Sequence, residues 1–290
     1  DSGAEGLTLL SCDNLAGNGA VLDRLMRAYL ASEAPDLLDW FIAQCTCPST
    51  MVDRIVPATT EADRAAAQVA TGLRDEALVV TEPFSQWVIE DRFANGRPAW
   101  DGAGAELVSD VGPYETAKLR MLNGAHSLLA YAGLQAGHGF VHGAIADGEL
   151  RALVEAPMRE AMATIDPAPG QDLSAYATSL IERFANPALN HRLAQIAMDG
   201  SQKLPQRWLE TLAESQSEGR ACPAILRGLA AWIGHLRGGN GPVDDPLAGQ
   251  LSQAAHSADP VDALFGAAGI LRSEWPPAAA DRAHIARYLD

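Results

Sequence analysis

The spacing of apolar residues along the chain changes character near residues 105–113. Before this point, short β-like runs at residues 7–11 and 77–81 are separated by helical stretches at 20–32 and 61–73, which is typical of an α/β arrangement. After it, apolar residues recur with helical spacing over residues 114–136, 148–165, 173–184, 205–214 and 223–236. The pattern predicts a mainly α protein, with an α/β portion over residues 1–110 and an all-helical domain over residues 111–290.

Glycine and proline clusters divide the helical part. Residues 166–170, 238–242 and 276–277 combine these two residue types and predict surface loops. The same reasoning predicts that Asn186 caps a helix starting at Pro187 and that Gly200 ends it. We find no internal repeat that would change this division.

Composition narrows the classes of function. The chain has 290 residues, of which 48% are hydrophobic, so it can bury one large core or two smaller ones. Its formal net charge of −16 repels phosphate backbones and anionic lipid, which argues against nucleic acid or membrane partners. No apolar run approaches the roughly 20 residues that a membrane-spanning helix needs. Four scattered cysteines fit a reducing, cytoplasmic setting, and the oligomeric state stays open.

The cysteine and histidine spacings argue against a metal site. Cys45 and Cys47 are separated by one residue, which does not match the usual ligand pair of a zinc site, and no second pair follows. His138 and His142 are four apart, but the glycines around them disfavour a helix. We therefore predict no bound metal.

A group of polar residues opens the helical run at residues 114–136. On an α-helix, His126 lies about 80° and Asn123 about 140° around the axis from Lys118, so all three can border one cleft. A lysine against apolar neighbours loses hydration and can act as a general base, while amide and imidazole N–H groups can hold a developing oxyanion. The alternative is structural: a solvated lysine, a helix irregularity at Asn123-Gly124 and an ordinary core histidine.

These residues lie within one of five ordered blocks that resemble the mannitol dehydrogenase family. This family of long-chain polyol dehydrogenases includes mannitol, arabinitol and sorbitol dehydrogenases and the hexuronate reductases. The matching blocks are SCDNLAGNG (residues 11–19), CPSTMVDRI (47–55), TEPFSQWVIE (81–90), YETAKLRMLNGAH (114–126), and NPALNHR (186–192) running on to QKLPQR (202–207). Each block is weak alone, but their joint order and spacing are specific.

The resemblance implies a zinc-independent oxidoreductase that uses NAD, with NADP possible. Lys118 would be the catalytic base, Asn14 and Asn123 would hold the substrate oxygen, and His126 would orient the alcohol. Asn14 follows a predicted strand, and the carboxyl ends of strands are where ligands bind in open α/β sheets. Taken alone, Asn14 fits an Asx-turn or a helix cap equally well. Residues 1–110 would belong to a Rossmann-type cofactor domain.

Two acidic residues gain roles in the same way. Asp53 matches a family position near the nicotinamide, although an ion pair with Arg54 is the local alternative. Glu115 lies three residues before Lys118 and would pass the Lys118 proton to water. The alternative is an ordinary i,i+3 ion pair between the two side chains.

A second group supplies donors and cations for the substrate: His191, Arg192, Lys203 and Arg207. Donors suit the hydroxyls of a small polyol or ketose, and a cation facing the sugar terminus suits the carboxylate of a hexuronate. The sequence therefore predicts a polyol dehydrogenase, with a hexuronate reductase as the alternative. A catalytically silent helical binding module is the alternative from another class.

The sequence lacks a phosphate-binding glycine turn. Gly137-His-Gly139-Phe-Val-His-Gly143 follows a helical stretch and has the wrong last spacing for G-x-G-x-x-G, and Gly17-Asn-Gly19 lacks a third glycine. By the resemblance, the first third to two-fifths of a family member would be missing. We accordingly expect the 290-residue chain alone to bind a dinucleotide weakly and to show no useful turnover.

Overall fold

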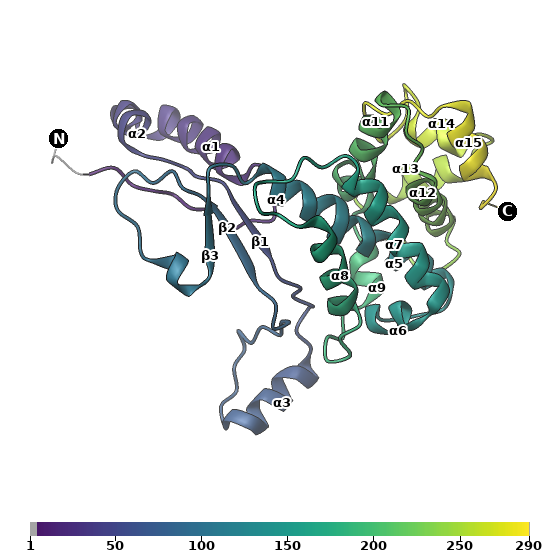
Figure 1. The fold of residues 1–290 in the computed structure, drawn as a ribbon, viewed down its shortest axis with the longest axis horizontal. Helices are drawn as coiled ribbons and strands as arrows, with labels where there is room; N and C mark the ends of the chain where they lie inside the picture. Colours follow the sequence, from purple (N-terminus) through teal and green to yellow (C-terminus); the bar gives the residue numbers. More distant parts are fainter. Residues whose placement is uncertain (1–4, 290) are drawn as a thin grey trace. The chain divides into compact units, whose positions relative to one another are not determined.

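The computed structural model describes residues 5–289. Their contacts divide the chain into two compact units (Figure 1). The first unit contains the chain up to Ile55 and the segment Glu82–Thr116, and the second contains Val56–Thr81 and the chain from Ala117 onward. Within the described residues, no helix is long and apolar enough to span a membrane.

The first unit is built on a mixed three-stranded sheet in the order β1-β2-β3. Its strands are β1 (Thr50–Asp53), β2 (Gln86–Glu90) and β3 (Ala105–Val108), with β2 antiparallel to β1 and parallel to β3. The helices of this unit are α1 (Asn18–Glu33), α2 (Leu38–Gln44) and two short 3-10 turns, η1 (Pro35–Leu37) and η2 (Trp100–Ala103). Leu30, Phe41 and Cys47 form a small core between α1, α2 and the chain leading to β1.

A buried asparagine joins α1 to β1. The Asn18 side chain donates to the carbonyls of Asp13 and Thr50, both at 2.9 Å, and accepts the Thr50 N–H at 3.0 Å. The Thr50 hydroxyl in turn donates to the carbonyl of Ser11 at 2.6 Å. These bonds satisfy buried backbone groups and fix the loop that carries Asn14 against the start of β1.

The strand predictions for residues 7–11 and 77–81 are both wrong. In residues 7–11 only Thr8 pairs, through an isolated parallel bridge to Thr46, and residues 77–81 form no strand. Val79 in the second run is 62% exposed. A β-branched run favours a strand only where another strand and a packed face accept it, and this segment has neither in the described structure.

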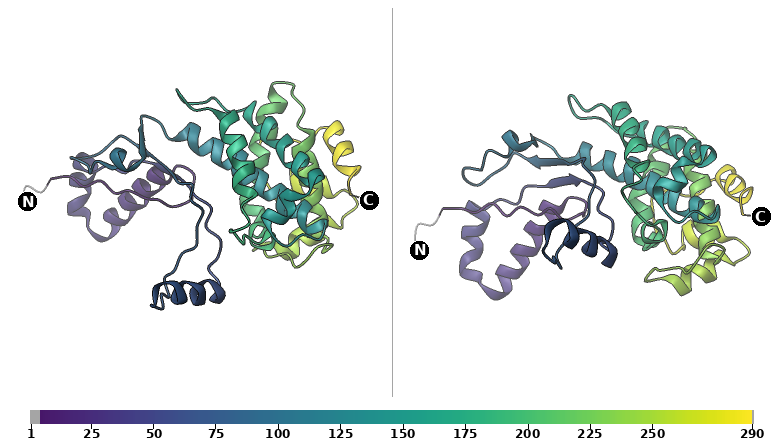
Figure 2. Two further views of the ribbon diagram at one scale, coloured as in Figure 1. Left: turned by 60° about the horizontal axis from the view of Figure 1, so that its bottom comes forward. Right: turned by 90° about the horizontal axis from the view of Figure 1, so that it is seen from below.

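Residues 77–81 belong instead to an arm that carries α3 (Glu61–Thr71) at the end of two extended segments (Figure 2). Thr60 and Asp63 form a capping box at the start of α3, and Gly72 ends it in the left-handed conformation. None of its residues is buried, and Val69 is 88% exposed. Capping and side-chain ion pairs therefore carry more of the stability of this helix than packing does.

The second unit is helical. After α4 (Gly112–Ala117), which leads into it, its elements are η3 (Lys118–Asn123), α5 (Gly124–Gln135), α6 (Val141–Ala146), α7 (Gly148–Met162), α8 (Leu173–Phe184), α9 (Leu193–Ala197), α10 (Gly200–Leu204), η4 (Pro205–Leu209), α11 (Glu210–Ser217), α12 (Pro223–Leu236), α13 (Ala248–Ala255), α14 (Pro260–Phe265) and α15 (Ala279–Ala286). Helix α5 is apolar on all sides and is surrounded by α6, α7, α9 and α12, as expected for a central core helix.

Local signals explain where the outer helices begin. Asp172 and Asp147 accept backbone N–H groups at the starts of α8 and α7. Helix α12 begins at Pro223, and its first N–H groups, from Ala224 and Ile225, donate to Glu160 of α7 at 2.8 and 2.9 Å. A carboxylate from another helix thus replaces a local cap.

The structure corrects the predicted helix between Asn186 and Gly200. The Asn186 side chain accepts the Ala188 N–H in a turn, and helix α9 begins only at Leu193. Gly200 begins α10 instead of ending a helix. A Cβ at Gly200 would lie 2.5 Å from the indole nitrogen of Trp232 and 2.8 Å from the Tyr131 hydroxyl, so close packing accounts for this glycine.

Arg120 ties the start of the central run to α11. Its guanidinium is buried and donates to both carboxylate oxygens of Glu214, at 2.5 and 2.6 Å, and to the Thr164 hydroxyl at 2.9 Å. Such bidentate charged hydrogen bonds are strong and geometrically specific.

This network predicts a clear stability difference between two arginines. We expect Arg120→Met to lower the free energy of unfolding by about 2 kcal/mol, because it removes three partly buried charge-assisted bonds. The matched control is Arg151→Met, whose exposed ion pair with Glu155 should contribute less than about 0.5 kcal/mol. Urea unfolding followed by circular dichroism measures both, and equal effects would contradict the assignment.

Candidate active site

The run that contains Lys118, Asn123 and His126 is not one regular helix. Residues Lys118–Asn123 form a π-helical segment, η3, between α4 and α5, and the Gly124 N–H donates to the carbonyl of Leu119. In a π-helix each residue is bonded to the fifth residue along instead of the fourth. Lys118 and Asn123, five apart, therefore lie on the same side of the segment, whereas on an α-helix they are about 140° apart around the axis. The predicted grouping is tighter than a regular helix allows.

Two side-chain donors in this run are buried without a partner. Asn123 is 8% and His126 is 6% exposed, and neither the Asn123 Nδ2 nor the His126 Nε2 has a hydrogen-bond partner within residues 5–289. An unpaired buried polar group costs about 1–3 kcal/mol, and such groups in native proteins call for a specific explanation. Their position one turn apart on the same helix points to a bound ligand.

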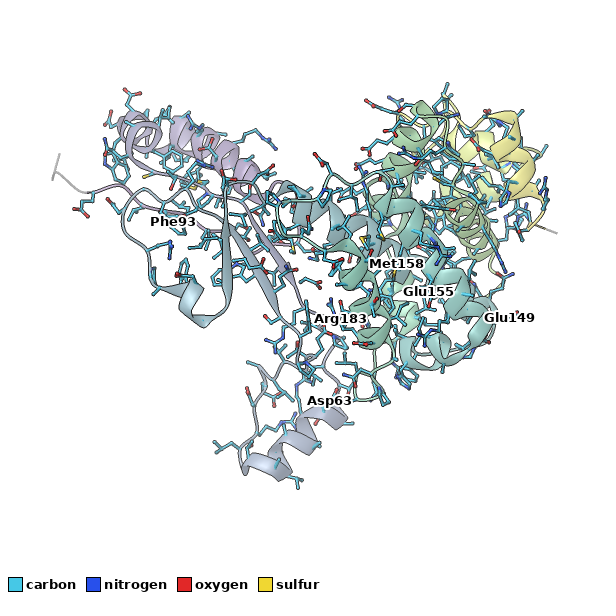
Figure 3. The ribbon with its side chains drawn as sticks, in the orientation of Figure 1. Asp63, Phe93, Glu149, Glu155, Met158 and Arg183 are labelled. Carbon is cyan, nitrogen blue, oxygen red and sulfur yellow. The ribbon has the colours of Figure 1, made fainter. Side chains whose placement is uncertain are left out.

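His126 is held by aromatic contacts. Its ring stacks on Phe184 of α8 at 4.2 Å and meets the edge of His191 at 5.5 Å. Burial lowers the pKa of His126 well below its usual value, and His191, Arg207 and Arg183 of α8 lower it further (Figure 3). Near neutral pH this imidazole is therefore uncharged and carries one N–H donor.

His191 has the same character. Burial lowers its pKa to about 4, and its Nδ1 also has no partner in the described part of the chain. The neighbouring backbone is fixed: the Val141 N–H donates to the His191 carbonyl, and Phe140 and Arg192 form an antiparallel bridge. The structure thus brings His191 to His126 from a loop 65 positions away.

A second π-helical segment, η4, packs against the first. Arg207 donates to the Asn123 carbonyl at 3.3 Å and to the Ser127 hydroxyl at 2.7 Å, and the Trp208 indole donates to the Gly124 carbonyl at 3.2 Å. Burial lowers the pKa of Arg207 to about 10, which leaves it a cation at neutral pH. Its contacts brace the Asn123 backbone from the side of η4.

Lys203 and Arg192 have different settings. The Lys203 amine donates to the Met198 carbonyl at 2.5 Å and lies 3.8 Å from Asp199, and burial followed by the charge of Arg207 lowers its pKa. Arg192 is exposed, with its guanidinium 5.5 Å from the centre of the Phe140 ring. Lys203 therefore lies in the partly desolvated charge environment of Arg207, whereas Arg192 lies at the surface.

The remaining predicted residues belong to the first unit. Asn14 is exposed in the bend before α1, whose N-cap is Gly17 without a side-chain cap, so Asn14 is not the cap of this helix. Asp53 is buried at the carboxyl end of β1. Both carboxylate oxygens of Glu115 accept the Gly17 N–H, at 3.1 and 3.2 Å. Glu115 thereby supports the positive end of α1.

One sequence signal was missed. Lys118 and Lys203 are the only lysines in the chain, and every other basic residue apart from histidine is arginine. Arginine stays charged in proteins, whereas the pKa of lysine shifts readily on burial. A chain that places both of its lysines in the candidate site marks them as functional more clearly than their spacing does. Arg183 and Ser127, by contrast, carry no sequence signal, because only folding brings them to the site.

No group of three histidine, cysteine or acidic side chains within residues 5–289 could hold a metal ion. The four cysteines are free thiols, and the chemistry available at the site is that of an amine, an amide, two imidazoles and arginines.

The chain belongs to the mannitol dehydrogenase family. The family model described as "Mannitol dehydrogenase C-terminal domain" matches residues 110–270, more than half of the chain, and the model described as "Mannitol dehydrogenase Rossmann domain" matches residues 1–102. The resemblance drawn from the five sequence blocks is confirmed, as is a mainly helical chain with a small sheet.

Several individual proteins of known name are similar to this chain over most of its length. D-mannonate oxidoreductase of Escherichia coli (strain K12) is 41% identical over 285 residues, which are 95% of this chain and 59% of the relative. Uncharacterized oxidoreductase YdfI of the same organism is 45% identical over 262 residues, 88% of this chain and 54% of the relative. The structure of Pseudomonas fluorescens mannitol 2-dehydrogenase in a ternary complex with NAD and D-mannitol is similar with a TM-score of 0.85 and 36% identity, over 97% of this chain and 59% of that one. The chain thus spans between half and three-fifths of these proteins.

The depressed pKa values predict how stability depends on pH. His191 has a pKa of about 4 in the folded chain against 6.5 for an ordinary histidine. Between these values the unfolded chain binds a proton that the folded chain does not, so stability falls as the pH falls from about 6.5 to about 4. The slope from this residue is at most about 1.4 kcal/mol per pH unit.

We expect His191→Gln to flatten this loss, and His256→Gln, at an exposed histidine, to leave it unchanged. Urea unfolding at a series of pH values compares the variants. The same pH dependence in His191→Gln and the parent would contradict the burial of a neutral imidazole.

Proposed function

We propose that this chain serves an NAD(P)-dependent dehydrogenase that interconverts a secondary alcohol of a small polyol with the corresponding ketone, with Lys118 as general base. One observation carries the proposal: two buried N–H donors, on Asn123 and His126, five and eight residues after Lys118, have no hydrogen-bond partner among residues 5–289. An alcohol oxygen that becomes an alkoxide provides the acceptor that these donors need. Membership of the mannitol dehydrogenase family supports the same chemistry.

In the oxidation, the Lys118 amine removes the proton of the substrate hydroxyl. The Asn123 amide N–H and the neutral His126 imidazole N–H donate to the oxygen as negative charge develops on it. A nicotinamide dinucleotide, when bound, would supply the hydride acceptor that conversion of the alcohol to a ketone requires. In the reduction, Lys118 returns the proton to the oxygen. Neutral imidazoles suit this role because they donate without adding further positive charge beside the amine.

The residues present fit only part of the cofactor. The buried carboxyl group of Asp53, at the carboxyl end of β1, is suited to the nicotinamide end of the cofactor. The glycine turn that binds pyrophosphate in a Rossmann domain does not occur in this sequence. The solved complex of the similar mannitol 2-dehydrogenase contains NAD, and a 36% identical relative is named polyol:NADP oxidoreductase, so both dinucleotides have relatives.

Three residues of the first unit complete the proposal. By the family resemblance, Asn14 would supply a second amide donor for the substrate oxygen. Glu115 would relay the Lys118 proton to water; its bond with Gly17 leaves lone pairs for this, since an ionised carboxylate has about four. Asp53 would contact the cofactor.

The substrate is a polyol or a sugar acid. His191, Lys203, Arg207 and Arg192 would form the wall that binds the rest of the molecule. The similar proteins include both a D-mannonate oxidoreductase and mannitol 2-dehydrogenases, so both substrate classes have relatives. Two partly desolvated cations, Lys203 and Arg207, favour a carboxylate through charge-assisted bonds, and this supports hexuronate reduction as the second candidate.

A catalytically silent binding module is the third candidate. It would have to retain unpaired buried donors beside the lysine at a cost in stability, without a reaction that uses them. This cost favours the dehydrogenase.

The first test, made on the full-length enzyme with a complete cofactor domain, is turnover of mannitol, D-arabinitol and D-mannonate with NAD and with NADP. With the substrate that is oxidised, we expect Lys118→Met to lower kcat by at least about 10²-fold, the scale of a general base. Arg151→Met, at an exposed position of α7, is the control and should leave kcat unchanged. Near-normal oxidation at pH 7 by Lys118→Met would refute the base, and no binding or turnover of any pair would refute the dehydrogenase.

A separate prediction distinguishes the substrate classes. If Lys203 binds a carboxylate, Lys203→Met should lower kcat/KM for D-mannonate by about 10-fold or more relative to mannitol, because a charged hydrogen bond contributes about 1.5–3 kcal/mol. Equal losses for the two substrates would instead show that Lys203 binds hydroxyl groups. The ratio of the two values is measured in one assay, so any general loss of activity cancels.

A further inference from the structure

The two π-helical segments, η3 and η4, are in contact where η3 passes into α5. The residues that touch are 84 positions apart in the sequence. The Trp208 indole of η4 donates to the Gly124 carbonyl, at the point where η3 passes into α5. Arg207 donates to the preceding carbonyl, of Asn123. The hydrogen-bond ladder changes here from the fifth-residue to the fourth-residue pattern, and side chains of η4 satisfy the carbonyls at the change.

The sequence accounts for the second π segment. Pro205 has no N–H, and its ring clashes with the carbonyl of the fourth residue before it, so α10 cannot continue regularly through this position. The Glu210 N–H then bonds to the Pro205 carbonyl, five residues back. This shift directs Trp208 toward α5.

Gly124 permits the approach from the other side. A Cβ at this position would lie 3.3 Å from both the Arg207 carbonyl oxygen and the Trp208 indole nitrogen, which is tighter than ordinary contact. A side chain here would push the indole away from the carbonyl that it holds.

The orientation of the Trp208 ring is fixed by packing. The residue is 1% exposed, its ring meets Tyr131 edge-on at 6.3 Å, and a Cβ on Gly228 would lie 3.0 Å from its far edge. With the ring enclosed in this way, its N–H has little freedom to leave the Gly124 carbonyl.

We propose that Trp208 is a positioning residue: by holding the Gly124 carbonyl, it maintains the π-helical form of Lys118–Asn123 and so keeps Lys118 and Asn123 on the same side of the helix. The functional meaning of this role rests on the proposed base and oxyanion donor. If the ladder relaxed to the fourth-residue pattern, the two side chains would lie about 140° apart around the helix. They would no longer face one substrate oxygen.

The two-lysine composition gives a direct test without turnover. Reductive ¹³C-methylation labels Lys118, Lys203 and the N-terminus, and Lys203→Arg assigns the signals. In Trp208→Phe, which keeps the ring but removes the N–H, we expect the titration midpoint of the Lys118 signal to move by about 0.5 pH unit or more, because its charges and hydration change. A crystal structure of the variant should show the Gly124 N–H bonded to Arg120 instead of Leu119.

Trp275→Phe is the matched control, since Trp275 is equally buried and packs against Phe265. It should move the Lys118 midpoint by less than about 0.2 pH unit. A parent-like midpoint together with a parent-like ladder in Trp208→Phe would overturn the proposal. A dehydrogenase assay that fails would not, because neither measurement uses the reaction.

If Trp208→Phe does not fold, Gly124→Ala tests the same contact from the other partner. The added methyl separates the indole from the carbonyl, and we expect the same movement of the Lys118 signal and the same change of ladder. A folded Gly124→Ala chain in which Lys118 and the Leu119 bond match the parent would equally overturn the proposal.

Discussion

The close approach of η4 to the start of α5 is the constraint on which the candidate site depends. Helix α5 is buried on nearly every side, so the carbonyls at its first turn have no access to bulk water. Trp208 and Arg207 donate to two of them, and Gly124 leaves room for these donors. The interaction satisfies backbone groups at an irregular point of the helix and also aligns Lys118 with Asn123. Stability and site geometry therefore depend on the same few contacts.

The candidate site combines positively charged side chains with neutral histidines. A chain of net charge −16 surrounds its candidate site with cations, and the two histidines there are neutral because burial lowers their pKa values. Neutral imidazoles add donors without adding repulsion to Lys203 and Arg207, whose pKa values burial already lowers. A substrate oxygen that gains negative charge is stabilised by such surroundings, whereas in the free site the same cations repel one another. In the proposed reaction, these cations would therefore stabilise the substrate oxygen that carries negative charge.

Particular elements show how far the sequence could predict this structure. Helices α8 and α12 match the predicted ranges because a clear apolar period is bounded by Asp172 and Pro223. The strands failed because short apolar runs become strands only where a partner pairs with them, which local sequence does not encode. The π segment was equally hidden, since apolar spacing continues through Lys118–Asn123 without a break. The sequence showed which polar residue types lie at the candidate site. It could not show that N–H groups of Asn123 and His126 have no partner among residues 5–289, because long-range packing decides this.

The turn before Lys203 holds this cation by backbone geometry. Asp199 is the one residue other than glycine with positive φ in the described chain, at 54°, and such a conformation persists only where the surroundings impose it. Asp245, 44 residues after Ser201, fixes this turn by accepting the N–H and the hydroxyl of Ser201, while the Asp199 N–H donates to the Asp244 carbonyl. The strained turn places the Asp199 carboxylate near the Lys203 amine, whose proton is bound to the Met198 carbonyl. These contacts orient Lys203 within the free chain, so under the proposed substrate role less side-chain entropy would be lost on binding.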